Sequence, residues 1–97
     1  MAIFIILGSF TQEGVTKIKE SPQRYEAAKQ IAKSVGGEIK EFYYTMGRYD
    51  FVSIVEAPNS EAMMRGLLIL GSTGAVRTET LQAIPLKKVV DIIKDLP

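Results

Sequence analysis

The fold is decided by one apolar stretch of the sequence, AIFIILGSF, which covers residues 2–10. β-Branched and aromatic residues that end in a turn signal at Gly8-Ser9 are typical of a β-strand. Alternate side chains of a strand point to opposite faces, and here both faces are apolar. One face carries Ile3, Ile5 and Leu7, and the other carries Phe4, Ile6 and Phe10. We therefore expect residues 2–10 to form a central strand that is covered on both sides.

Helix and strand patterns alternate along the residues that follow. A short helical segment over residues 11–19, capped by Thr11, precedes a longer helix over residues 21–35. Residues 38–46 and 49–57 are the next predicted strands. Because only two residues separate them, they should pair as an antiparallel hairpin.

The second half of the chain continues with helix, strand and helix. Residues 60–70 have almost no polar face, so we expect this helix to be buried on more than one side. Within it, Glu61 and Arg65 are spaced as an i, i+4 ion pair. Residues 75–84 form the fourth predicted strand, and a last helix follows Pro85. Its apolar stripe consists of Leu86, Val89, Val90, Ile93 and Leu96.

The element order is β-α-β-β-α-β-α, the split βαβ pattern of a ferredoxin-like α+β fold with an added C-terminal helix. Right-handed crossovers give a four-stranded antiparallel sheet in the order 4-1-3-2, with both main helices on one face. The other face would then expose more apolar surface than a monomer normally does. We therefore predict that residues 1–97 form a single domain that dimerises sheet on sheet. The alternative is that the C-terminal helix folds over the open face.

Composition excludes several kinds of chemistry. The 97 residues include no cysteine and no histidine, which rules out thiolate nucleophiles, imidazole bases and ordinary zinc sites. We predict no bound metal and no cofactor. Twelve basic and 11 acidic side chains leave a net charge of +1, which does not favour nucleic acid as a partner. The apolar start is too short to span a membrane and lacks a basic leader region, so we expect a cytoplasmic protein without a membrane partner.

The densest cluster of polar chemistry is TMGRYD, at residues 45–50. Two-residue periodicity is expected to place Arg48 and Asp50 on one face of the hairpin and Tyr49 on the other. Arg48 could bind a carboxylate or phosphate, and Asp50 could act as a general base if it is desolvated. The alternative is structural: an ion pair between Arg48 and Asp50 that fixes the turn or the edge of a dimer.

Two further pairs of residues are candidates for a site. Arg77 and Glu79 share one face of the fourth predicted strand. Charges on an edge strand normally prevent aggregation, but Arg77 is the next candidate for anion binding if it faces a cavity. Tyr43 and Tyr44 lie on opposite faces of the second strand, so only one of them can line a pocket on the open side. Packing alone would also explain both tyrosines.

Several short motifs occur in the same order as in a known family. They are Thr-x-x-Gly at residues 11–14, Ser-Pro at 21–22, Gly-x-Tyr-Asp at 47–50 and Arg-Thr-Glu-Thr at 77–80. The sequence resembles the GYD domain family, which takes its name from the third motif, up to about Ile84. The resemblance implies a ferredoxin-like protomer and a dimeric α/β barrel, but no particular activity. Wider relatives include cofactor-free monooxygenases, haem-handling enzymes and small-molecule sensors, and the absence of histidine argues against haem.

Three functions remain open at this stage, since a fold does not choose among them. We expect first a small-molecule-binding or sensing homodimer whose ligand is anchored by Arg48 or Arg77. The alternative is a cofactor-independent enzyme, monooxygenase-like or isomerase-like, with Asp50 as base and a tyrosine as proton donor. The third is a structural module that assembles into homodimers or larger homo-oligomers and buries the same charges as pairs.

Overall fold

The computed structural model describes all 97 residues and contains the expected succession of elements. Its strands are β1 (Ala2–Phe10), β2 (Glu38–Tyr44), β3 (Phe51–Ala57) and β4 (Val76–Ala83). Its helices are α1 (Gln12–Thr16), α2 (Ser21–Ser34), α3 (Ser60–Gly71) and α4 (Leu86–Lys94), with a 3-10 turn at Ile18–Glu20. Strands β2 and β3 are shorter than predicted because residues 45–50 form a loop. None of the helices has the length and apolar character needed to cross a membrane.

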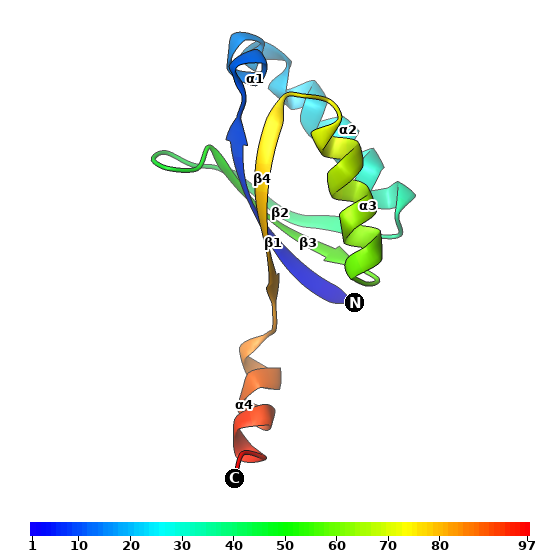
Figure 1. The fold of residues 1–97 in the computed structure, drawn as a ribbon, viewed down its shortest axis with the longest axis vertical. Coiled ribbons are helices and arrows are strands. Elements are labelled where there is room, and N and C mark those ends of the chain that lie inside the picture. The colour runs from blue at the N-terminus through cyan, green and yellow to red at the C-terminus, as the bar shows by residue number, and fades with distance from the viewer.

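The four strands form one antiparallel sheet in the order β2-β3-β1-β4. This is the predicted order 4-1-3-2 read from the opposite edge. Helices α2 and α3 lie on the same face of the sheet (Figure 1), as right-handed crossovers require. The other face is referred to as the open face. Its residues are Ile3, Ile5, Leu7 and Ser9 of β1, Glu38, Glu41 and Tyr43 of β2, Val52, Ile54 and Glu56 of β3, and Arg77, Glu79, Leu81 and Ala83 of β4.

The two faces of β1 differ in burial. Phe4 and Ile6 point toward the helices, and with 5% and 6% of their surface exposed they belong to the core. Ile3, Ile5 and Leu7 lie on the open face and are only partly buried. Within a single chain, the predicted coverage of β1 is therefore met on one side and not on the other.

The core itself is small. Only 13 of the 97 residues are buried, and the main cluster centres on β1 and β3. The ring of Phe51 packs against the main chain of β1 at Gly8, where a methyl group would overlap it. The same ring stacks on Phe42 of β2, with the two ring centroids 5.1 Å apart. The core thus depends on a glycine at position 8 and on aromatic contacts between neighbouring strands.

Helix α3 is less buried than its sequence predicts. Met63 points into the core, but Met64 and Leu68 are 57% and 67% exposed. The prediction of burial on more than one side is wrong for the single chain, because only the sheet side of this helix finds a partner. The predicted pair of Glu61 and Arg65 is also not among the three ion pairs of the structure.

Helix α4 does not cover the open face. It continues beyond the end of β4 and projects away from the rest of the molecule (Figure 1). With α4 included, the whole chain is 53 Å long and 17 Å thick. None of its residues is buried. The alternative in which the C-terminal helix folds over the sheet is therefore wrong, and the open face stays uncovered by the chain itself.

The motif residues Thr11 and Gly14 join two distant loops. The Thr11 hydroxyl accepts a hydrogen bond from Gly14 N–H over 3.2 Å and so caps α1, as predicted. The same hydroxyl donates to the carbonyl of Gly74 over 2.6 Å. Gly14 also packs against the carbonyl of Ala75 so closely that a side chain would not fit. The β1–α1 turn and the α3–β4 loop are thereby held together.

Candidate functional site

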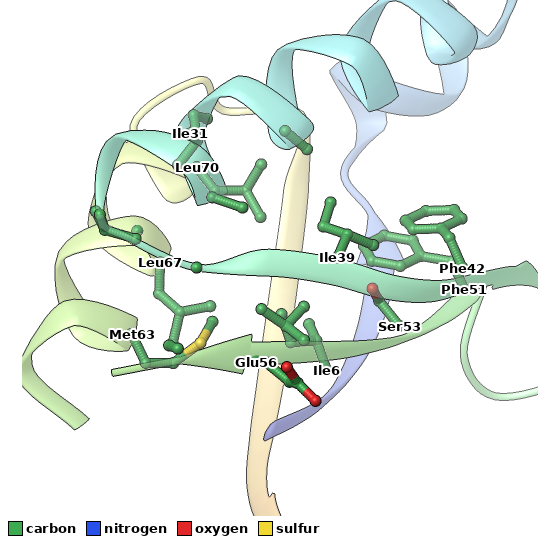
Figure 2. A pocket seen from close by; sticks show the side chains of 17 residues that line it. Ile6, Ile31, Ile39, Phe42, Phe51, Ser53, Glu56, Met63, Leu67 and Leu70 are labelled. Carbon is green, nitrogen blue, oxygen red and sulfur yellow. The ribbon is translucent and has the colours of Figure 1, made fainter. Parts of the chain in front are cut away.

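The space between the sheet and helices α2 and α3 is a small apolar cavity (Figure 2). Ile31 and Leu70 reach into it from the helices, and aromatic and aliphatic side chains line it from the sheet. Its volume is about 60 Å³, whereas ligand pockets usually measure roughly 300–1,000 Å³. Among its few polar groups, the Ser53 hydroxyl already donates to the carbonyl of Glu41 over 3.0 Å. This cavity is therefore packing space of the core, and the candidate site residues lie elsewhere.

Residues 45–50 form a closed loop at the tip of the β2–β3 hairpin, which projects from the sheet (Figure 1). Thr45 holds its two ends together. The Thr45 hydroxyl donates to the carbonyl of Tyr49 over 2.6 Å, and its N–H donates to the carbonyl of Asp50 over 2.9 Å. Gly47 turns the chain with a φ of +105°, a conformation that glycine adopts most easily. These contacts fix the positions from which Tyr49 and Asp50 reach the sheet.

Asp50 binds the main chain at the end of β1. Its carboxylate accepts a hydrogen bond from Phe10 N–H over 2.8 Å, and its own N–H donates to the carbonyl of Gly8, also over 2.8 Å. The two bonds extend the pairing of β1 with β3 by one residue beyond Phe51. This contact favours the structural interpretation of Asp50, and its role as a general base stays a prediction.

The structure does not bring Arg48 and Asp50 together, and no ion pair joins them. The Arg48 guanidinium instead lies over the ring of Tyr49, 5.7 Å from its centroid, as in a cation–π contact. The Tyr49 hydroxyl donates to a carboxylate oxygen of Glu79 over 3.2 Å. Contacts therefore run from Arg48 through Tyr49 to Glu79. Sequence reasoning missed this link, because alternation along β4 gives the face of Glu79 but not the loop that reaches it.

Arg77 and Glu79 share the open face, as their spacing predicts. Arg77 lies opposite Ser9 of β1, and Glu79 lies opposite Leu7. A cation, a carboxylate and a phenol thus border the apolar centre of the open face, and Arg77, Glu79 and Tyr49 are together referred to as the polar corner. No group of three acidic residues gathers closely enough to hold a metal ion.

Tyr43 and Tyr44 lie on opposite faces of β2, as predicted. Tyr44 is on the helix side, where its ring meets Phe42 edge-on and its hydroxyl is hydrogen-bonded to Ser21 of α2. Tyr43 is on the open face and donates to a carboxylate oxygen of Glu41 over 3.0 Å. This hydrogen bond, together with the negative charge of Glu41, raises the pKa of Tyr43. Of the two tyrosines, only Tyr43 is therefore available to a partner on the open face.

The chain that makes these contacts also matches a family model. A family model described as "GYD domain" matches residues 4–93. The chain belongs to the GYD domain family. In this GYD domain the residues of the Gly-x-Tyr-Asp motif make the contacts of the hairpin tip: Gly47 turns the hairpin, Tyr49 reaches β4, and Asp50 binds the main chain at the end of β1.

A curated relative of this GYD domain comes from Thermus thermophilus. It is the "Glutamine synthetase and cystathionine beta-lyase binding protein", and it is 34% identical over 95 residues. The match covers 97% of this chain and 100% of the relative. The likeness therefore extends over the whole GYD domain and includes α4.

Solved structures of low identity share the fold of the GYD domain. A feast or famine regulatory protein from M. tuberculosis, complexed with L-methionine, matches with a TM-score of 0.67 at 15% identity over 88% of this chain. The chain spans about half of that protein, 51% of its length. A second protein of Thermus thermophilus matches with a TM-score of 0.57 at 23% identity, over 88% of this chain and 95% of its own. These matches confirm the ferredoxin-like α+β architecture and leave the activity open.

Proposed function

We propose that this GYD domain is a homodimeric binding protein that docks on a metabolic enzyme. The observation that carries the proposal is the full-length likeness, at 34% identity, to a protein named for binding two enzymes. Two features of the chain support it. The cavity between the sheet and helices α2 and α3, about 60 Å³, is too small for a typical substrate, and the carboxylate of the candidate base Asp50 already accepts a hydrogen bond from Phe10 N–H.

The open face supports self-association. Its central side chains are aliphatic, and no element of the chain covers them. Leu81 of β4, which lies opposite Ile5 of β1, is 47% exposed. Two copies that pack open face on open face would bury this surface and form the dimeric α/β barrel that the family resemblance implies.

The outer side of α3 supports a second contact, made with another protein. Met64 and Leu68 follow one another at helical spacing on the layer of helices, away from the open face. They would therefore stay exposed in a sheet-on-sheet dimer. Methionine and arginine are enriched at protein interfaces, and Arg65 is an exposed neighbour on the same helix.

Glutamine synthetase is the first enzyme in the relative's name. The test measures, by biolayer interferometry, whether this chain binds purified glutamine synthetase from its own organism. We expect Leu68→Asp to abolish binding because it places a charge in the apolar contact. Gln30→Asp is the matched control: it introduces the same charge at an exposed position of α2 and should bind as the wild type does. Absence of binding by the wild type to either named enzyme would contradict the proposal.

The polar corner favours a second candidate function, the binding of a small ligand at the dimer interface. Arg77 could hold a carboxylate and Glu79 a cationic group, as a zwitterion requires. A thermal-shift screen of amino acids and small acids tests this, since a ligand at a hundredfold excess over its Kd stabilises by about 2.7 kcal/mol. Arg77→Met should remove any shift, and a shift that survives this change would place the ligand elsewhere.

A further inference from the structure

Helix α4 is amphipathic and has no apolar partner in its own chain. Leu86 and Ile93 of its apolar stripe are 78% and 57% exposed, and Leu96, two residues beyond the end of the helix, is 62% exposed. Lys87 and Lys94 belong to the polar side. A helix of nine residues is marginal by itself in water and normally depends on burial of its apolar side. The stripe therefore needs a surface that the single chain does not supply.

The position of α4 points to the surface in question. Between α4 and the end of the sheet lies an open hollow of about 560 Å³, lined in part by Ile3, Ala83 and Ile92. Ile3 and Ala83 are also residues of the open face. The hollow and the helix that borders it are thus continuous with the apolar centre of the sheet.

The area of the open face gives a second reason. Four strands about 4.8 Å apart, with seven residues that each rise about 3.3 Å, present a footprint of roughly 450 Å². A stable interface usually buries about 800 Å² on each partner. The accessible surface of the side chains is larger than this flat footprint, and α4 is the adjoining apolar surface that would add to the area buried on each partner.

We propose that α4 docks on the second copy of the chain and completes the sheet-on-sheet interface with its apolar stripe. The inference rests on the dimer of the proposed function and adds to it an element that enlarges the interface. In such a dimer, each copy contributes its α4 to the other, so two helices are buried for every pair of chains.

The test compares three glutamine variants of the full chain by analytical ultracentrifugation. Ile93→Gln removes an apolar group from the stripe, Lys87→Gln is its control on the polar side of α4, and Leu81→Gln probes the open face. We expect Ile93→Gln to raise the dimer Kd about tenfold or more, in keeping with the loss of a buried aliphatic side chain. Lys87→Gln should leave the dimer Kd unchanged.

The outcomes separate the two proposals. If Leu81→Gln weakens the dimer and Ile93→Gln does not, the docking of α4 is overturned while the dimer stands. A wild type that is monomeric at micromolar concentration overturns both. If Ile93→Gln lowers the melting temperature but leaves the dimer Kd unchanged, α4 packs on its own chain. If it weakens only the binding of an enzyme, α4 belongs to that interface.

A cross-link then identifies the neighbour directly. The chain has no cysteine, so Ile93→Cys introduces a single attachment point for a benzophenone label. Labelled chain is mixed with an excess of ¹⁵N-labelled chain and irradiated. Cross-links between light and heavy chains are expected, whereas cross-links within the light chain alone would overturn the proposal. Lys87→Cys serves as the control position.

Discussion

Asp50 offers a direct test of whether the Gly-x-Tyr-Asp motif is structural or catalytic. The carboxylate of Asp50 accepts the N–H of Phe10 over 2.8 Å at a partly buried position. Asp50→Ala removes this acceptor, whereas Asp50→Asn keeps an oxygen in the same place but removes the charge. A structural role predicts that alanine is much more damaging than asparagine. A catalytic role predicts that both are equally inactive and that stability hardly changes.

The magnitude follows from the kind of hydrogen bond that is lost. A bond to a charged group contributes about 1.5–3 kcal/mol net, and a neutral one about 1 kcal/mol. Because Phe10 is only partly buried, its freed N–H can reach some water, so we expect Asp50→Ala to cost about 2 kcal/mol. For a domain of this size, 1 kcal/mol corresponds to about 4–8 °C in the melting temperature. Asp50→Ala should therefore melt roughly 8–16 °C below the wild type, and Asp50→Asn only a few degrees below it.

Differential scanning calorimetry at fixed chain concentration measures these shifts, and amide exchange of Phe10 reports on the bond itself. Glu20→Ala is the control, since this exposed carboxylate makes no side-chain capping bond. We expect faster exchange at Phe10 in Asp50→Ala and unchanged exchange in Glu20→Ala. Equal melting temperatures for Asp50→Ala and Asp50→Asn would refute the structural reasoning and return Asp50 to the catalytic candidates.

Two other predictions follow from single contacts. Gly66→Ala should stabilise the protein by about 1 kcal/mol in urea unfolding, because alanine favours the helix and its methyl group meets only ordinary contacts. Gly8→Ala should destabilise the protein, since its methyl group would displace the ring of Phe51. A destabilised Gly66→Ala would show that the cavity beside it is not free. Because the pKa of Tyr43 is raised above its ordinary value of 10.0, the stability contributed by its hydrogen bond to Glu41 is fully present below pH 10 and is lost as the pH rises through the raised pKa. Glu41→Gln should therefore lower the pKa of Tyr43 toward 10 in an NMR titration of the ring carbons, and an unchanged pKa would exclude Glu41 as the cause.

The sequence predicts the topology well because local signals agree with one another. The period-two pattern of residues 2–10, the Thr11 cap and the short hairpin connection each describe interactions within a few residues. Together with right-handed crossovers they predict one strand order, and the sheet has that order. The faces of Tyr43 and Arg77 follow from the same alternation.

The failures concern partners that lie far away in sequence. Hydrophobicity predicts that α3 and α4 bury their apolar residues, but it does not say whether the partner belongs to the same chain. Met64 and Leu68 therefore remain exposed where burial was expected. Residue spacing likewise suggested an ion pair between Arg48 and Asp50. It could not reveal that the Asp50 carboxylate instead accepts a hydrogen bond from the N–H of Phe10, 40 residues away in the sequence.

The scarcity of buried residues has a consequence for how the protein would behave in a cell. With 13 of 97 residues buried, the isolated chain has little to hold it together, and association would supply much of the missing stability. In the proposed dimer, folding would follow the law of mass action, and dilution would destabilise the chain. The amount synthesised would set the fraction that survives proteolysis, and expression level alone would serve as a threshold switch.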